Sequence, residues 1–119
     1  MSGFSLAKRV QSFRDAGRGI VTTVRTQHNA WIHIVAAILV VSLGLGLGLR
    51  LEDWKWLVLT IALVCFAETV NTAIEYLCDV VSPEHNEAVK HAKDIAAGAV
   101  LICAICAVIM GALIFLPYL

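Results

Sequence analysis

Three long apolar runs alternate with short polar segments along the chain. They cover about residues 30–49, 54–79 and 95–117. A helix needs roughly 20 apolar residues to cross the hydrocarbon core of a bilayer, and each run meets that length. Open β-sheets leave backbone groups unpaired in lipid, and three strands are too few to close into a barrel. The pattern therefore predicts three transmembrane helices.

A different pattern precedes the first run, over about residues 4–27. Apolar positions recur there at steps of three and four, namely Leu6, Val10, Phe13, Gly17, Val21 and Val24. Basic residues mostly occupy the other side of such a helix. This arrangement is typical of a helix that lies in the membrane interface. We therefore expect residues 1–119 to form a single all-α integral membrane unit, with one surface helix and three spans.

The overall composition agrees with a membrane protein and excludes most soluble classes. Of the 119 residues, 60% are hydrophobic and 15% are charged, and the mean hydropathy is +0.83. Soluble domains are about 45–50% apolar and about 25% charged. Nine basic residues balance nine acidic ones, so there is no basic excess to indicate a nucleic-acid partner.

The basic residues are unequally divided between the two sides of the membrane. With three spans, the N-terminal segment and the loop after the second span lie on the same side. That side carries seven of the nine Lys and Arg residues. Because these residues favour the cytoplasmic face, we expect a multi-pass protein of the inner (cytoplasmic) membrane with its N-terminus in the cytoplasm.

The second run contains ionisable residues that are rare inside membrane segments. At about 100° per residue, Glu68, Glu75 and Asp79 fall within about 40° of one another, and Asn71 flanks the same face. Such a stripe has three interpretations: a divalent-cation site, a proton or ion relay, or a polar seam that joins helices. Three helices are too few to shield the stripe on every side, so we also expect the chain to oligomerise.

A polar loop, residues 82–94, follows the stripe and favours catalysis over transport. It opens on Ser82–Glu84, whose central proline is typical of a helix N-terminus. It ends on Lys93 and Asp94. A lysine at the membrane edge can hold a phosphate while nearby carboxylates hold its metal ion. The alternative is that Lys93 only anchors the end of a span.

Two features of the first run are interpreted as packing. Gly44, Gly46 and Gly48 lie in an apolar run without a strand–turn–helix frame. We therefore expect close helix packing or a helix end there, not a nucleotide-binding loop. For His33, in the same run, packing is also the expectation, with a helix–helix hydrogen bond or contact with the site as alternatives.

The stretch AETVNTAIEYLCD…EHNEAVKHAKDIAAGAVL, within residues 67–101, resembles the signature of the prokaryotic diacylglycerol kinase family, which also includes undecaprenol kinases. The resemblance extends from about Asp15 to the closing IFLP. It implies a homotrimer that transfers the γ-phosphate of ATP, with Mg²⁺, to the hydroxyl of a membrane lipid. The family has no P-loop, and no G-x-x-x-x-G-K-[ST] motif occurs in this sequence.

The resemblance also assigns roles to individual residues. Glu68 corresponds to the catalytic base, and Asn71 lines the site beside the lipid substrate. Glu75 corresponds to a metal-binding carboxylate. Contacts to ATP and its metal are implied for Asp79, Glu84, His85, Asn86, Lys93 and Asp94, together with Glu75 and Gln27. Gln27 stands where the family has its second metal carboxylate, so it offers Mg²⁺ a carbonyl oxygen but no negative charge.

This replacement leaves two functions open. The first is an active lipid kinase in which Glu75 and the ATP phosphates hold Mg²⁺, assisted by Gln27. The second is a non-catalytic trimeric membrane protein, or a proton-handling channel, that has lost a metal carboxylate. The residues do not decide between diacylglycerol and undecaprenol as the lipid substrate.

Overall fold

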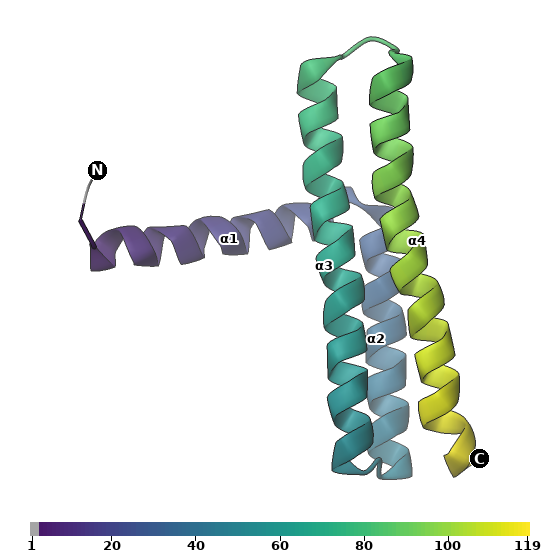
Figure 1. The fold of residues 1–119 in the computed structure, drawn as a ribbon. Helices are drawn as coiled ribbons and strands as arrows, with labels where there is room; N and C mark the ends of the chain where they lie inside the picture. Colours follow the sequence, from purple (N-terminus) through teal and green to yellow (C-terminus); the bar gives the residue numbers. More distant parts are fainter. Residues whose placement is uncertain (1–2) are drawn as a thin grey trace.

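The computed structural model describes residues 3–119 as a helical bundle with one further helix that projects sideways from it (Figure 1). Within this range the elements are α1 (Leu6–Thr26), α2 (His28–Leu47), α3 (Leu51–Val81), α4 (Glu87–Phe115) and a 3₁₀ turn, η1 (Leu116–Tyr118). Helices α2 and α3, and α4 together with η1, are long and apolar enough to cross a membrane. The predicted all-α fold, with three helices long and apolar enough to span a membrane, is therefore confirmed.

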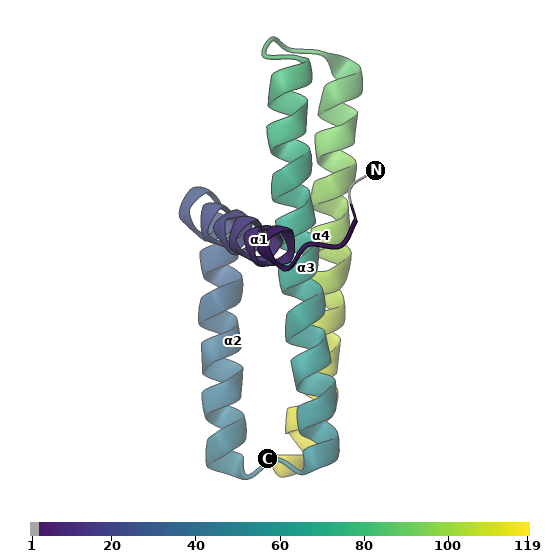
Figure 2. The same cartoon turned by 90° about the vertical axis from the view of Figure 1, so that its left-hand side faces the viewer.

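Helices α3 and α4 form the main pair of the bundle. They run antiparallel as a long hairpin, and α2 packs beside them (Figures 1 and 2). A buried apolar cluster of Leu49, Leu57, Ile114 and Phe115 lies where α2 joins α3 and where the chain ends. This cluster closes the end of the bundle opposite the α3–α4 loop.

Two glycines shape the turn between α2 and α3. Gly48 ends α2 with a φ of 67°, a left-handed conformation that glycine adopts without steric cost. Gly44 packs against the turn, because a Cβ at this position would lie 2.8 Å from Leu49 Cδ1. The prediction of a helix end and of close packing is confirmed at Gly48 and Gly44, whereas Gly46 faces open space.

The start of α4 differs from the sequence prediction. Ser82 is the C-cap of α3, and its hydroxyl donates to the Glu84 carbonyl at 2.8 Å. Helix α4 begins at Glu87, where the Asn86 side chain accepts a hydrogen bond from the Val89 backbone N–H at 3.2 Å. The predicted helix start at Ser82–Glu84 is therefore wrong, because Asn86 supplies the cap that the first turn requires.

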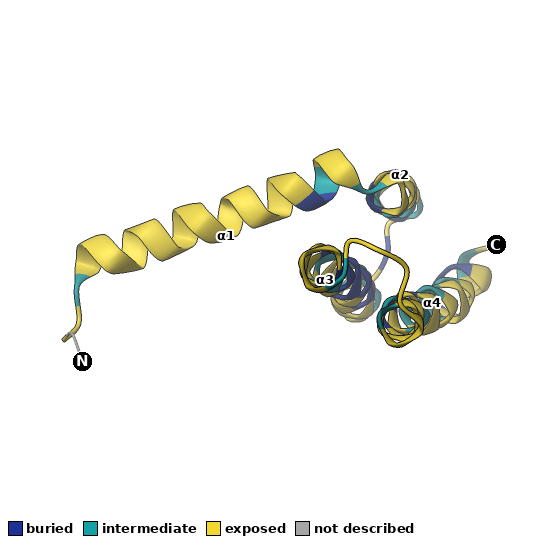
Figure 3. Ribbon diagram, turned by 90° about the horizontal axis from the view of Figure 1, so that it is seen from above, coloured by how far each residue is buried: buried dark blue, intermediate teal, exposed yellow. Residues whose placement is uncertain are grey.

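Helix α1 contacts the bundle only through its C-terminal part. Thr23 is buried and Val24 is half-buried, whereas the residues from Leu6 to Thr22 are exposed (Figure 3). Phe13 on α1 and Phe4, which precedes the helix, are both large apolar side chains and are exposed. A bilayer surface would cover such residues, but the interfacial position of α1 stays a prediction.

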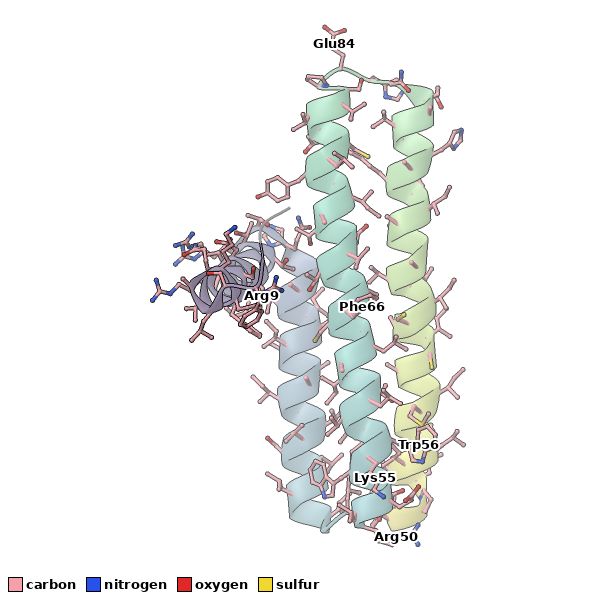
Figure 4. The ribbon with its side chains drawn as sticks, turned by 60° about the vertical axis from the view of Figure 1, so that its left-hand side comes forward. Arg9, Arg50, Lys55, Trp56, Phe66 and Glu84 are labelled. Carbon is pink, nitrogen blue, oxygen red and sulfur yellow. The ribbon has the colours of Figure 1, made fainter. Side chains whose placement is uncertain are left out.

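Large apolar side chains also cover the outside of the three long helices. Examples are Leu39 on α2, Phe66 midway along α3 and Val108 on α4, all of them exposed (Figure 4). If they were exposed to water, each of these side chains would lose the free energy of about 1.5–3 kcal/mol that burial of such a side chain provides. Lipid removes that penalty, so this distribution is typical of a membrane-embedded bundle.

A polar contact ties the last turn of the chain to the start of α3. The Tyr118 hydroxyl donates to the Asp53 carboxylate and accepts from the Arg50 backbone N–H at 3.1 Å. The Arg50 guanidinium also lies 3.7 Å from Asp53. Arg50, Lys55 and Trp56 lie together at this end of the bundle (Figure 4). The contact fixes the C-terminal turn beside the α2–α3 loop.

We expect Tyr118→Phe to destabilise the fold by about 1–3 kcal/mol, because it leaves the Asp53 carboxylate without its hydroxyl donor. Thermal unfolding of the purified protein in detergent would measure this loss. Tyr76→Phe, which removes the hydroxyl of an exposed tyrosine on α3, is the matched control and should leave the unfolding temperature unchanged. An equal decrease in both variants would contradict the assignment.

Candidate active site

Three polar residues of α3 are buried where α1 crosses the bundle. Glu68, Asn71 and Thr72 are 2%, 5% and 3% exposed. Thr72 and Thr23 of α1 line the same groove of about 530 Å³, so these residues lie at the level of α1. Beyond that level the α3–α4 hairpin continues (Figures 1 and 2). The buried polar residues thus mark the point where the bundle meets the crossing helix.

The carboxylate of Glu68 is buried with few partners. Within the described residues, neither of its oxygens accepts a hydrogen bond. Nε2 of His33, on α2, lies 3.5 Å from Glu68 Oε2, which is longer than an ordinary hydrogen bond. Burying a carboxylate without partners is costly. Such a group indicates a functional site, where a proton, cation or substrate completes the interactions.

The remaining polar side chains of α3 extend from Glu68 toward the α3–α4 loop. Asn71 Nδ2 donates to Glu75 Oε1 at 3.4 Å, while Asn71 Oδ1 has no partner in the part of the chain that the structure describes. The Thr72 hydroxyl donates to the Glu68 backbone carbonyl at 2.9 Å. The residues that helical periodicity puts on one face of α3 therefore lie together and leave free oxygen acceptors.

An ion pair joins this stripe to α4. Lys93 Nζ of α4 lies 2.7 Å from Asp79 Oδ1. Asp79 is on α3, one helical turn beyond Glu75. Asp94, the next residue of α4, pairs with Lys90 at 2.8 Å. In the sequence analysis Lys90 is used only as one of the basic residues that predict the membrane orientation of the chain. Its i,i+4 spacing to Asp94 is the signal that could have predicted this ion pair. The two helices thus bring a lysine beside the α3 carboxylates, at the end of the bundle that the loop closes.

The loop residues Glu84, His85 and Asn86 occupy the tip of the hairpin, where Glu84 marks the turn (Figure 4). His85 Nε2 lies 2.9 Å from Glu87 Oε1, and the Asn86 oxygen caps α4. These contacts stay within the loop and the first turn of the helix. Asn86 therefore has a structural role that the sequence resemblance did not indicate, and the ATP contacts of this loop stay a prediction.

Gln27 lies at the junction between α1 and α2, on another part of the chain. Its backbone N–H donates to the Thr23 carbonyl at 3.1 Å, and its side chain is half-buried. Across residues 3–119, no three His, Cys, Asp or Glu side chains come together as a metal site. Mg²⁺ commonly uses one or two carboxylates together with substrate phosphates. The oxygen donors of Glu75 and Asn71 fit that kind of shared site.

An apolar cavity of about 390 Å³ lies between α2, α3 and α4. The α3 residues that line it run from Leu57 to Cys65, on the far side of Glu68 from the hairpin loop. His33 lines this cavity and also lies beside Glu68. Packing is the sequence expectation for His33, whereas this distance supports its alternative, contact with the site. The signal was an ionisable side chain in an otherwise uncharged span.

These features define a small helical membrane protein with a polar site built mainly on one long helix. Residues 14–115 match the family model of prokaryotic diacylglycerol kinase. The chain belongs to this family. The resemblance that the motifs indicate is therefore confirmed over most of the sequence.

Two curated relatives agree with this membership. The chain is 42% identical over 109 residues to an undecaprenol kinase of Bacillus subtilis. The aligned region covers 92% of this chain and 89% of that relative. The chain is also 41% identical over 107 residues to a diacylglycerol kinase of Synechocystis sp. The aligned region covers 89% of this chain and 61% of that relative. The predicted class of enzyme, a lipid kinase, is thus confirmed, and both lipids remain alternatives.

The burial of Glu68 predicts that its removal stabilises the fold. We expect Glu68→Met to raise the free energy of unfolding by about 1–3 kcal/mol, since it replaces a buried carboxylate that lacks partners by an apolar group of similar length. Thermal unfolding in detergent would measure the change. Glu75→Met, at a half-exposed position with an Asn71 donor, should give a smaller gain. A marked loss of stability in Glu68→Met alone would contradict this account of the site.

Proposed function

We propose that the chain transfers the γ-phosphate of ATP to the hydroxyl of a membrane lipid at the cytoplasmic interface. The observation that carries this proposal is the buried Glu68 carboxylate, whose oxygens accept no hydrogen bond within the described residues. It lies between an apolar cavity and a row of polar groups that leads to the hairpin loop. One end of the site thus suits a hydrocarbon chain, and the other suits a charged nucleotide.

The cavity beside His33 is proposed to hold the hydrocarbon chain of the lipid. Its walls come from three helices and are almost wholly apolar, with small residues such as Ala36, Ala104 and Gly111 among them. A chain that lies there brings its polar end to the level of Glu68. Ligand pockets are typically lined mainly by apolar side chains with a few polar groups that orient the ligand, and this cavity with His33 and Thr60 has that composition.

The polar end is proposed to hold the phosphates of ATP. Lys93, held by Asp79 at 2.7 Å, would supply positive charge beside the phosphates, and Glu75 with Gln27 would contribute oxygen ligands to Mg²⁺. When bound, Mg²⁺ neutralises phosphate charge and orients the groups that react. Phosphoryl transfer depends on such positioning and charge neutralisation more than on covalent participation by the protein.

In the proposed reaction, Glu68 accepts the proton of the lipid hydroxyl as a general base. The lipid oxygen forms a bond to the γ-phosphorus, and the bond between that phosphorus and the β–γ bridging oxygen breaks. The products are the lipid phosphate and ADP. Asn71, which borders Glu68 and donates to Glu75, would align the acceptor with the nucleotide end of the site.

We further propose a homotrimer in the inner membrane, with the N-terminus in the cytoplasm. The family resemblance and the distribution of basic residues support this arrangement. One chain already buries Glu68, Asn71 and Thr72, so these three residues do not need an oligomer to shield them from lipid. Size-exclusion chromatography with light scattering would measure the oligomeric state.

Mixed-micelle assays with radiolabelled ATP test the activity and the substrate together. We expect phosphate transfer to undecaprenol or diacylglycerol, and a loss of about 100-fold or more in kcat for Glu68→Ala, because the general base is gone. ATP binding should be largely unchanged in that variant. Glu52→Ala, at the opposite end of α3, is the control. If the wild type transfers no phosphate to either lipid at any Mg²⁺ concentration, the proposal fails.

The role of Gln27 can be tested by restoring a negative charge. We expect Gln27→Glu to lower the Mg²⁺ concentration for half-maximal activity severalfold, because a carboxylate binds this hard cation better than an amide does. Gln11→Glu, at an exposed position on the preceding helix α1, controls for the addition of a negative charge elsewhere in the N-terminal segment. The same Mg²⁺ dependence in Gln27→Glu and wild type would show that this position does not contact the metal ion.

A further inference from the structure

Among the described residues, His33 is the one whose side chain forms an ion-pair contact with Glu68. Its Nε2 atom lies 3.5 Å from Glu68 Oε2, and the imidazole is 19% exposed while the Glu68 side chain is 3% exposed. The two residues come from different helices, α2 and α3. One ring nitrogen therefore faces Oε2 of a buried carboxylate, and neither carboxylate oxygen has a hydrogen-bond partner within residues 3–119.

We propose that His33 is a positioning residue for Glu68 in the lipid kinase reaction. In the tautomer that carries its proton on Nε2, the imidazole would donate to Oε2 of the carboxylate once the two atoms approach to hydrogen-bond distance. This contact fixes one oxygen and leaves Oε1 to accept the proton of the lipid hydroxyl. The inference rests on the proposed function, because it assigns to His33 the orientation of the base that this function requires.

The distance of 3.5 Å is consistent with a resting site that tightens when substrate binds. It exceeds the usual 2.7–3.2 Å for a nitrogen–oxygen hydrogen bond. Catalytic hydrogen bonds are often long without substrate and shorten in the reacting complex. A difference of about 1 Å in the position of a reacting group can change a rate by about 100-fold.

The apolar cavity links this pair to the lipid. Ile32, His33 and Ala36 of α2 line it together with Val64 and Cys65 of α3. A hydrocarbon chain in the cavity therefore contacts both helices that carry the pair. Lipid binding would in this way set the separation of α2 and α3, and with it the distance between Nε2 and Oε2.

The competing role for His33 is packing, as part of the cavity wall. The two roles make different demands on the side chain. Positioning requires a hydrogen-bond donor near Oε2, whereas packing requires only volume. Glutamine and methionine have similar length and volume, but only glutamine offers an N–H donor. The pair His33→Gln and His33→Met therefore separates the two roles.

Steady-state kinetics in mixed micelles, with wild type and both variants side by side, would test the inference. We expect kcat to fall about 10- to 100-fold in His33→Met and to stay within about fivefold of wild type in His33→Gln. The KM values for ATP and for the lipid should change little, because the bound state keeps its contacts. Val35→Ala, at an exposed position on the same helix that does not line the cavity, should match wild type.

Equal kcat values in His33→Gln and His33→Met would overturn the inference, as would a higher lipid KM with an unchanged kcat, which indicates a cavity wall. If His33→Met does not fold, as judged by thermal unfolding, His33→Asn replaces it. Asparagine is one methylene shorter, so its amide falls short of Oε2, and kcat must lie well below that of His33→Gln. An active wild type with equal Asn and Gln variants rejects the inference alone. An inactive wild type rejects the proposed function and the inference with it.

Discussion

The arrangement of this molecule depends on one constraint: a carboxylate in the middle of a membrane helix has to be surrounded by protein. Glu68 meets it, because α3 turns Glu68, Asn71 and Thr72 inward and exposes Phe66 and Leu77 on its other side. The neighbouring helices pack against the inward face, and α1 crosses α3 at the same level. The other helices thus cover the polar face of α3, as expected because lipid is a poor solvent for charge.

Much of the fold follows from local properties of the sequence, and the parts that do not are those set by contacts between distant residues. Hydropathy and helical periodicity identify the three spans and the shared face of Glu68 and Glu75. Hydropathy marks what lies in lipid but does not mark where a helix begins. For this reason the start of α4 at Glu87, eight residues before the apolar run, escapes prediction until the cap formed by Asn86 is seen.

In the candidate site, too, some contacts could be predicted from the local sequence and others could not. The pairing of Lys93 with Asp79 joins residues fourteen positions apart, and the polar loop between them already suggests that a lysine returns to the α3 carboxylates. The pairing of His33 with Glu68 links two helices that cross the membrane separately, so no spacing rule gives it. Polar loop residues are ambiguous in another way, because an asparagine that caps a helix looks in sequence like one that binds a nucleotide.

Helix α3 runs from Leu51 to Val81 without a glycine or proline. The regions proposed for lipid and nucleotide therefore lie on one continuous, rigid helix. Residues from Leu57 to Cys65 line the apolar cavity, and Glu75 and Asp79 lie on the other side of Glu68, about 10 Å or more along the axis. Under the proposed function, we therefore expect substitutions in the cavity to alter the preferred hydrocarbon chain without disturbing the nucleotide end. This separation would allow the region proposed for the lipid and the region proposed for the nucleotide to change in sequence independently of each other.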